Sequence, residues 1–229
     1  MENKKYPSII FKERIKSIKS ELKKFCKETI DIYRDSISLI ENYDDNAADK
    51  IYSRTKKLDI YGYDIEKSCI RFMAVEQPLA GDLLYIESAI RIISHIKRIA
   101  HLCNNIANLA KEIEDFEMPQ KLIDNLSYMA DYVQIMLTSG FGAFYNQDVV
   151  VARELRDDDD KVDDLFDKII KQITDIIVDK NVNTKALINI LFISRFLERI
   201  ADRVVNIGDR VIFINTNKRP DIESLKEEG

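Results

Sequence analysis

The chain has 229 residues, a formal net charge of -5, and only 6 Gly and 4 Pro beside 45% hydrophobic residues. The scarcity of helix breakers predicts long helices around a sizeable core, and the acidic balance argues against a nucleic-acid binder. The longest nearly apolar run, VQIMLTSGFGAFY at 133–145, is too short to span a bilayer. Cys26, Cys69 and Cys103 are far apart and form no CxxC, which is typical of reduced core residues, so we expect a soluble cytoplasmic protein.

Three helices are expected in the first half of the chain. Apolar residues recur at helical spacing over 15–42, and a second helical pattern covers 45–75. A third helix is expected over 79–113. Pro78 suits its first turn, where the missing N–H costs nothing, and Asp82 complements its positive end.

The second half of the chain repeats this pattern. After a shift of 104 residues, Asp44 falls on Asp148 and Asp59 on Asp163, and after a shift of 101 the Arg98-Ile99-Ala100 triplet falls on Arg199-Ile200-Ala201. We attribute the three-residue difference to a shorter connection between the second and third helices of the second half. The prediction is an all-α protein of two tandem three-helix bundle repeats, at 9–116 and 117–215, followed by a polar C-terminal tail at 216–229.

Two carboxylates on the last helix are candidate ligands. Glu198 and Asp202 are four residues apart and therefore share one helix face. A buried seam is expected on the opposite side, through Ile193, Leu197, Ile200, Val204, Ile207 and Val211. Nearby arginines could form ordinary exposed ion pairs, worth roughly 0–1 kcal/mol each. This helix alone favours a solvated surface face.

A second carboxylate pair lies in ELRDDDDKVDDLFDK, at 154–168. The helical period runs through the four adjacent aspartates, and Asp159 and Asp163 again share one face. If this helix is antiparallel to the last one, the two pairs face a shared groove. Four carboxylates without His or Cys suit a hard cation such as Mg, Mn, Ca or ferric iron. The spacing by itself favours an acidic helix face or N-terminal cap that binds nothing.

The duplicated chain resembles the PhoU family along roughly 10–215. The family phrase L-E-R-I-(G/A)-D-x-x-x-N-I is similar to LERIADRVVNI at 197–207, and Q-P-x-A-x-D-L is similar to QPLAGDL at 77–83. Asp159 and Asp163 match the family's D-x-x-x-D pair. The resemblance implies a two-times-three helix bundle that binds multinuclear metal clusters on its surface. It also implies a non-catalytic regulator of phosphate uptake that contacts a membrane phosphate transporter, its sensor kinase, or both.

From this resemblance we expect a metal site on the second repeat. Its ligands would be Asp159, Asp163, Glu198 and Asp202, with Asn206 as a weaker candidate. Iron is the first expectation, and manganese, zinc, magnesium and calcium are the alternatives. The first repeat departs from the pattern, because Lys97, His101 and Thr55 replace three ligands and Asp59 alone remains. Its site is therefore expected to be degraded, with Asp59 and His101 as weak candidates.

Other functions stay open at this point. A metal-free helical adaptor for another membrane transporter fits the same pattern. A carboxylate-bridged di-iron enzyme fits less well, because such sites need Glu-x-x-His on facing helices and the chain contains no such motif. Contact with a membrane is expected through partner proteins only, and the resemblance suggests a homodimer.

Overall fold

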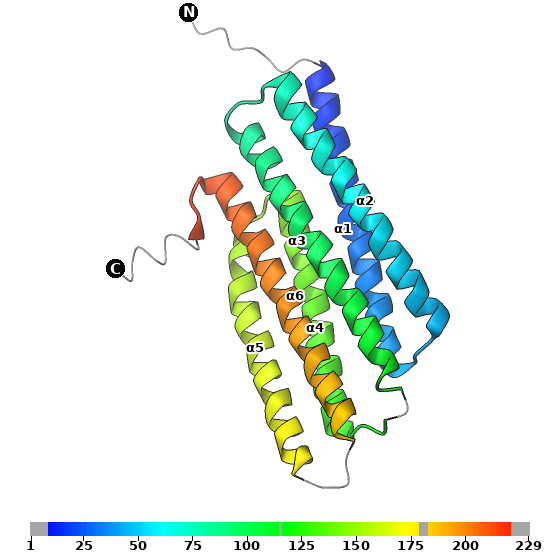
Figure 1. Cartoon of the computed structure of the whole chain (residues 1–229). Coiled ribbons are helices and arrows are strands. Elements are labelled where there is room, and N and C mark those ends of the chain that lie inside the picture. Colours follow the sequence, from blue (N-terminus) through cyan, green and yellow to red (C-terminus); the bar gives the residue numbers. More distant parts are fainter. Residues whose placement is uncertain (1–8, 115, 179–182, 221–229) are drawn as a thin grey trace, which may run out of the picture.

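The protein is an all-helical bundle (Figure 1). The computed structural model describes residues 9–114, 116–178 and 183–220. Within them are six helices and no strand: α1 Ile9–Glu41, α2 Asp45–Glu76, α3 Ala80–Lys111, α4 Gln120–Asn146, α5 Val149–Ile177 and α6 Thr184–Thr216. The all-α prediction and the two tandem three-helix repeats are confirmed. None of the described helices is long and apolar enough to cross a membrane.

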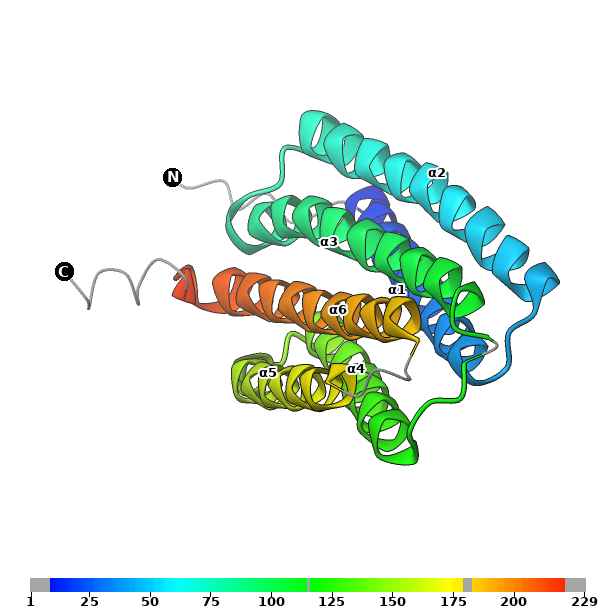
Figure 2. The same cartoon turned by 60° about the horizontal axis from the view of Figure 1, so that its bottom comes forward.

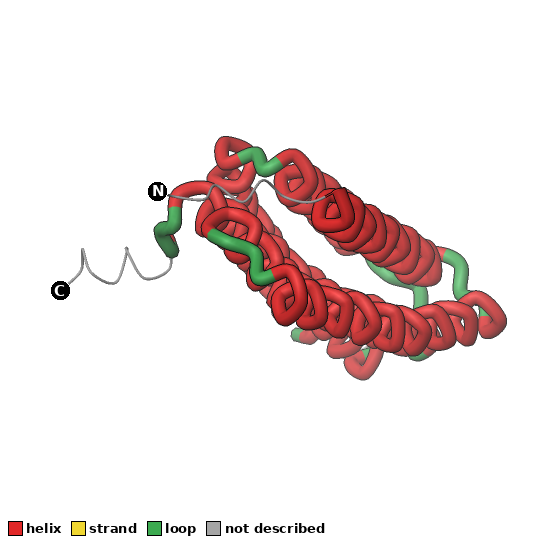
Figure 3. Tube along the Cα trace, turned by 90° about the horizontal axis from the view of Figure 1, so that it is seen from above, coloured by secondary structure: helices red, strands yellow, loops and turns green. Residues whose placement is uncertain are grey.

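The two repeats pack side by side through their third helices. α3 contacts α6 at the centre of the molecule, and α1 also contacts α4. α2 packs only on α1 and α3, and α5 packs only on α4 and α6, so these two helices are the outermost elements at opposite sides (Figure 2). Seen from above, the loops lie at the ends of the bundle (Figure 3). Among the described helices, none covers the outward face of α2 or of α5.

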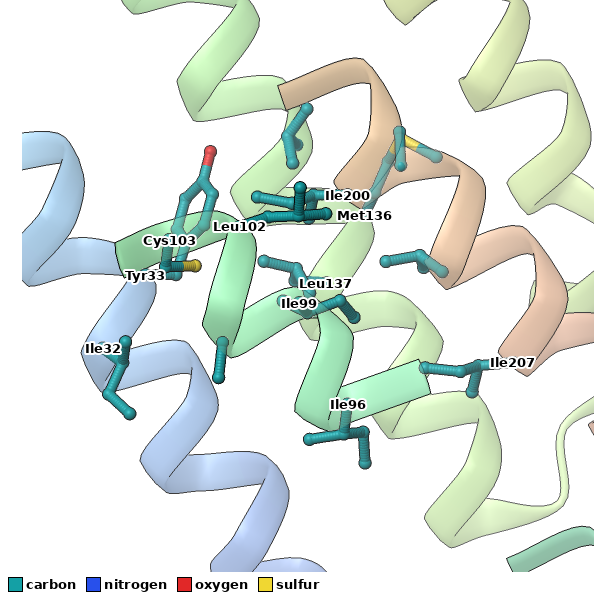
Figure 4. Packing of buried hydrophobic residues seen from close by; sticks show 14 of the residues in the cluster. Ile32, Tyr33, Ile96, Ile99, Leu102, Cys103, Met136, Leu137, Ile200 and Ile207 are labelled. Carbon is teal, nitrogen blue, oxygen red and sulfur yellow. The ribbon is translucent and has the colours of Figure 1, made fainter. Parts of the chain in front are cut away.

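One hydrophobic core serves both repeats. Apolar side chains of α1, α3, α4 and α6 interleave at the repeat junction (Figure 4), among them Ile32, Ile96, Ile99, Leu137, Ile200 and Ile207. The seam predicted on α6 is fully buried over all six positions. The buried Tyr33 hydroxyl donates to the Ala130 carbonyl oxygen at 2.7 Å, which ties α1 to α4 across the junction.

The three cysteines belong to this core. All three are buried and free of disulfide bonds. Burial raises the pKa of the Cys26, Cys69 and Cys103 thiols to about 12, so they stay protonated. The prediction that they are core residues is confirmed.

The helix starts confirm the 104-residue register of the duplication. Asp44 is the N-cap of α2 and accepts a hydrogen bond from the Ala47 backbone N–H at 2.6 Å. Its counterpart Asp148 is the N-cap of α5 and accepts from the backbone N–H groups of Val150 and Val151. Aspartate suits this position because its carboxylate satisfies N–H groups that have no partner inside the helix.

Two boundary predictions were wrong. Pro78 lies before α3 rather than in its first turn, since the helix begins at Ala80. Gln77 caps the end of α2 in the left-handed conformation (φ 46°). Pro78 and Leu79 then belong to the connection between the two helices. The connection after α5 is also not the shorter one. α5 ends at Ile177 and α6 begins at Thr184, whereas α2 ends at Glu76 and α3 begins at Ala80. α5 has 29 residues against 32 in α2, which offsets the longer connection. The three-residue difference arises instead in the first part of α6, because Arg199 lies 15 residues after Thr184 whereas Arg98 lies 18 residues after Ala80.

Candidate functional site

The four predicted carboxylate ligands meet where α5 packs on α6. α5 continues unbroken through the four adjacent aspartates, as the apolar period predicted. The two helices lie side by side (Figures 1 and 2), with Asp159 and Asp163 on one and Glu198 and Asp202 on the other. Besides burial, the charges of Asp202, Asp163 and Glu198 each raise the pKa of Asp159, so the four carboxylates lie close together. The structure therefore brings together two pairs that are about 40 residues apart in the chain.

The proximity of these carboxylates perturbs their ionisation. Burial, followed by the charges of Asp202 and Asp163, raises the pKa of Asp159 from 3.8 to about 7. Burial and the Asp202 charge also raise the pKa of Asp163, and burial is the main cause of the raised pKa of Glu198. Like charges at close range in a partly desolvated groove oppose ionisation, and a cation would relieve that opposition.

The groove is deeper than a solvated helix face. The Glu198 side chain is only 12% exposed because α5 covers it, whereas Asp202 is exposed. The prediction that both lie on the open surface is therefore wrong for Glu198. Among the described residues, Asp159 Oδ1 and Glu198 Oε2 are buried and have no hydrogen-bond partner. Such oxygens are costly to bury unless something compensates them.

Neighbouring charges already have partners. The Arg195 guanidinium binds the other oxygen of Glu198. Arg156 donates to both oxygens of Asp209, at 2.8 and 2.9 Å. Asp158 turns away from the groove, where the Tyr132 hydroxyl donates to it at 2.6 Å. Of the four predicted ligands, only Glu198 has an ion-pair partner among the described residues.

The donor set fits a metal ion in its chemistry. It offers carboxylate oxygens alone, two of them buried without a partner, as hard cations prefer. In the side-chain arrangement of the described residues, however, no group of three or more His, Cys, Asp or Glu could hold a metal ion. Binding would need these side chains to rearrange. A bound metal would supply positive charge and join α5 to α6.

At the matching positions of the first repeat, a basic side chain of α3 lies beside a carboxylate of α2. His101 and Asp59, the counterparts of Asp202 and Asp163, lie 3.0 Å apart from Nε2 to Oδ2. Lys97, the counterpart of Glu198, lies 4.0 Å from Glu66. Direct pairing thus joins α2 to α3 where α5 and α6 present carboxylates. The weak candidates Asp59 and His101 are brought together, bound to each other.

Asn206 and Asp160 lie next to predicted ligands of the groove. The Asn206 amide donates to the Asp202 carbonyl oxygen at 2.6 Å, so it points back along its own helix. Asp160 was not among the predicted ligands, yet its charge helps to raise the pKa of both Asp159 and Asp163. Asp160 directly follows Asp159 and lies three residues before Asp163, a helical spacing that also brings two side chains close together.

Comparisons with known proteins agree with this fold and this duplication. A family model described as the PhoU domain matches residues 22–110 and again 126–211. The phosphate-specific transport system accessory protein PhoU homolog 1 of Methanothermobacter thermautotrophicus is 40% identical over 95% of this chain and 99% of its own length. The PhoU homolog of Borreliella burgdorferi is 34% identical over 90% of this chain and 94% of its own.

Solved structures show the same fold. The crystal structure of PhoU from Pseudomonas aeruginosa superposes with a TM-score of 0.84 at 23% identity, covering 91% of this chain and 100% of that one. The phosphate transport system regulatory protein PhoU from Streptococcus pneumoniae also gives 0.84, at 19% identity, covering 91% of this chain and 98% of that one. The two matches to the domain and the 40% identical relative together show that the chain belongs to the PhoU family.

Proposed function

We propose that the protein is a cytoplasmic, non-catalytic regulator of phosphate uptake. It would act as an adaptor on a membrane phosphate transporter, on the associated sensor kinase, or on both, and restrain uptake when phosphate is plentiful. Family membership supports the general role, because the relatives are accessory proteins of phosphate-specific transport systems. The α5–α6 groove would contribute to that role through the surface it presents.

The observation that carries the proposal is the uncompensated charge of the groove. Asp159 has a pKa raised to about 7, and one oxygen each of Asp159 and Glu198 is buried without a hydrogen-bond partner. We propose that Asp159, Asp163, Glu198 and Asp202 hold a surface metal ion or cluster, with iron first. The metal would fix α5 against α6 and make this face less negative for a partner that docks there.

The test is elemental analysis of protein purified without a metal-affinity tag. Wild type is compared with Glu198→Ala/Asp202→Ala and, as a control, with Glu154→Ala/Asp175→Ala, which removes two exposed carboxylates of α5 outside the groove. We expect metal in wild type and in the control, and none in the groove variant, with helicity unchanged in all three. Metal retained by the groove variant would overturn the ligand assignment.

The regulatory role has a separate readout. In cells lacking the endogenous gene, we expect expression of wild type to lower phosphate uptake and to co-purify the transporter or the kinase. A groove variant that still restrains uptake would separate the adaptor role from metal binding. Uptake unaffected by wild type would overturn the regulatory role.

A metal-free adaptor is the second candidate, and one contact favours it. Arg195 already neutralises Glu198, and an ion pair at that position could replace a metal in tying the groove together. In this case wild type would contain no metal even after incubation with excess ion. Arg195→Ala would then weaken partner binding as strongly as Glu198→Ala.

A further inference from the structure

The outward face of α2 carries a row of large hydrophobic side chains in solvent. Tyr52 is 50% exposed, Ile60 64%, Tyr63 59% and Ile70 56%. Their spacing places all four within one face of the helix, which we call the α2 stripe. The row covers 19 residues, or about 27 Å of helix. An apolar row of this length on an outermost helix marks an interaction surface.

Basic side chains lie within and beside the α2 stripe. Lys56 and Lys67 lie between its apolar members, and Arg71 follows Ile70. The Lys56 ammonium lies 4.3 Å from the centre of the Tyr52 ring. Of the nearby carboxylates, Asp59 is paired with His101, and Asp64 points about 100° around the helix from Tyr63. The acidic Asp45 and Asp49 lie beyond the stripe, at the helix start.

The second repeat provides an internal comparison. Under the shift of 104 residues, the four apolar positions of the stripe correspond to Arg156, Asp164, Asp167 and Thr174 on α5. Lys56 corresponds to Asp160 and Arg71 to Asp175, whereas Lys67 corresponds to another lysine, Lys171. The same position in the fold therefore carries an apolar and basic face in one repeat and a mostly acidic face in the other. Packing within the bundle cannot require the hydrophobic residues, because α5 does without them.

We propose that the α2 stripe docks the protein directly on an anionic lipid surface. Tyrosine and isoleucine would enter the interfacial region, and the lysines and Arg71 would face lipid phosphates. Because α2 packs only on α1 and α3, the stripe lies on the outward face of the helix. A flat and deformable bilayer surface can contact such a face along its length. Direct contact of this kind goes beyond the proposed adaptor role and does not depend on the metal.

A second copy of the chain fits the stripe less well. The acidic face of α5 would complement the lysines, but it would place Asp164 and Asp167 against Ile60 and Tyr63, which desolvates charge without compensation. Two stripes packed together would bury little more than one helix face on each side. This is less than the roughly 1,000 Å² that a stable interface needs. The lipid surface satisfies both the apolar and the basic groups of the stripe.

The experiment is co-sedimentation of the full chain with vesicles. Neutral vesicles contain phosphatidylcholine alone, and anionic vesicles contain phosphatidylcholine mixed with phosphatidylglycerol. The variant Ile60→Asp/Tyr63→Asp gives the first repeat the residues that the second repeat carries. Its matched control is Tyr128→Asp/Ile135→Asp on α4, which changes the same residue types at 58% and 59% exposure. All four positions are exposed, so both variants should remain folded, as checked by circular dichroism.

We expect wild type and the α4 control to bind the anionic vesicles and the α2 variant to lose roughly tenfold or more in partitioning. Because the chain has no Trp, Tyr63→Trp adds a single reporter whose emission should shift to the blue on anionic vesicles. Tyr128→Trp should not shift. The proposal is overturned if wild type does not bind, if it binds neutral vesicles equally well, or if both Asp variants lose binding alike. It is also overturned if light scattering shows a dimer that the α2 variant alone dissociates, since the occupant is then a second copy.

Discussion

Replacing Asp159 with Asn tests whether repulsion among the carboxylates of the α5–α6 groove destabilises the folded protein. The folded protein holds the pKa of Asp159 near 7, against a usual value of 3.8. The native state therefore binds this proton more tightly than the unfolded chain does. The stabilising contribution of the protonated group is fully present below pH ~4 and is lost as pH rises through ~7. Asn is neutral throughout, so the substitution should remove that loss.

The size of the effect follows from the pKa. About three pKa units at ~1.36 kcal/mol each set a ceiling of about 4 kcal/mol. Because the group is only half-buried, solvent screening reduces this to roughly 1–2 kcal/mol. In metal-free buffer at pH 8, Asp159→Asn should therefore be more stable than wild type by about this amount. For a chain of this size, that corresponds to a rise in Tm of roughly 2–8 °C. At pH 4 the two proteins should be equally stable.

The assay is urea denaturation followed by circular dichroism at both pH values, in the presence of a chelator. Asp157→Asn is the control, because it removes the same charge from an exposed position on the same helix. A variant less stable than wild type at pH 8, or a difference that is the same at both pH values, would refute the reasoning. Added metal should reverse the order: at about a hundred times its Kd it would stabilise wild type by about 2.7 kcal/mol, and Asp159→Asn less.

Two further predictions concern the packing of the second repeat. Ile200→Asp should unfold this repeat, since the position is fully buried and an unpaired charge there costs several kcal/mol. Loss of the cooperative thermal transition would confirm this, and a near-wild-type Tm would contradict it. Gly208→Ala should destabilise the protein by about 1–3 kcal/mol, because a Cβ at this position would lie 2.8 Å from the Ala152 carbonyl oxygen. Gly142→Ala on α4 should instead stabilise the protein by about 0.5–1 kcal/mol, because a Cβ there contacts nothing. Similar effects at the two glycines would show that α6 does not pack tightly on α5.

The local order of the chain could be predicted from its sequence alone. Apolar residues at helical spacing and the scarcity of Gly and Pro gave the helices, because the period of buried positions follows directly from the helix geometry. The duplication was visible because Asp44 and Asp148 cap equivalent helices, and a cap is chosen by local hydrogen bonding. The carboxylate pairs at four-residue spacing were identifiable for the same reason.

The tertiary structure decided everything that depends on a neighbouring helix. Helical spacing places Glu198 beside Asp202, but only the packing of α5 over α6 makes Glu198 12% exposed and leaves Asp202 in solvent. The raised pKa of Asp159 arises from charges on another helix, and such charges cannot be assigned from spacing along one. The α2 stripe is apolar in the sequence like any core face. It is a surface because α1 and α3 cover the other side of the helix and no described helix covers this one.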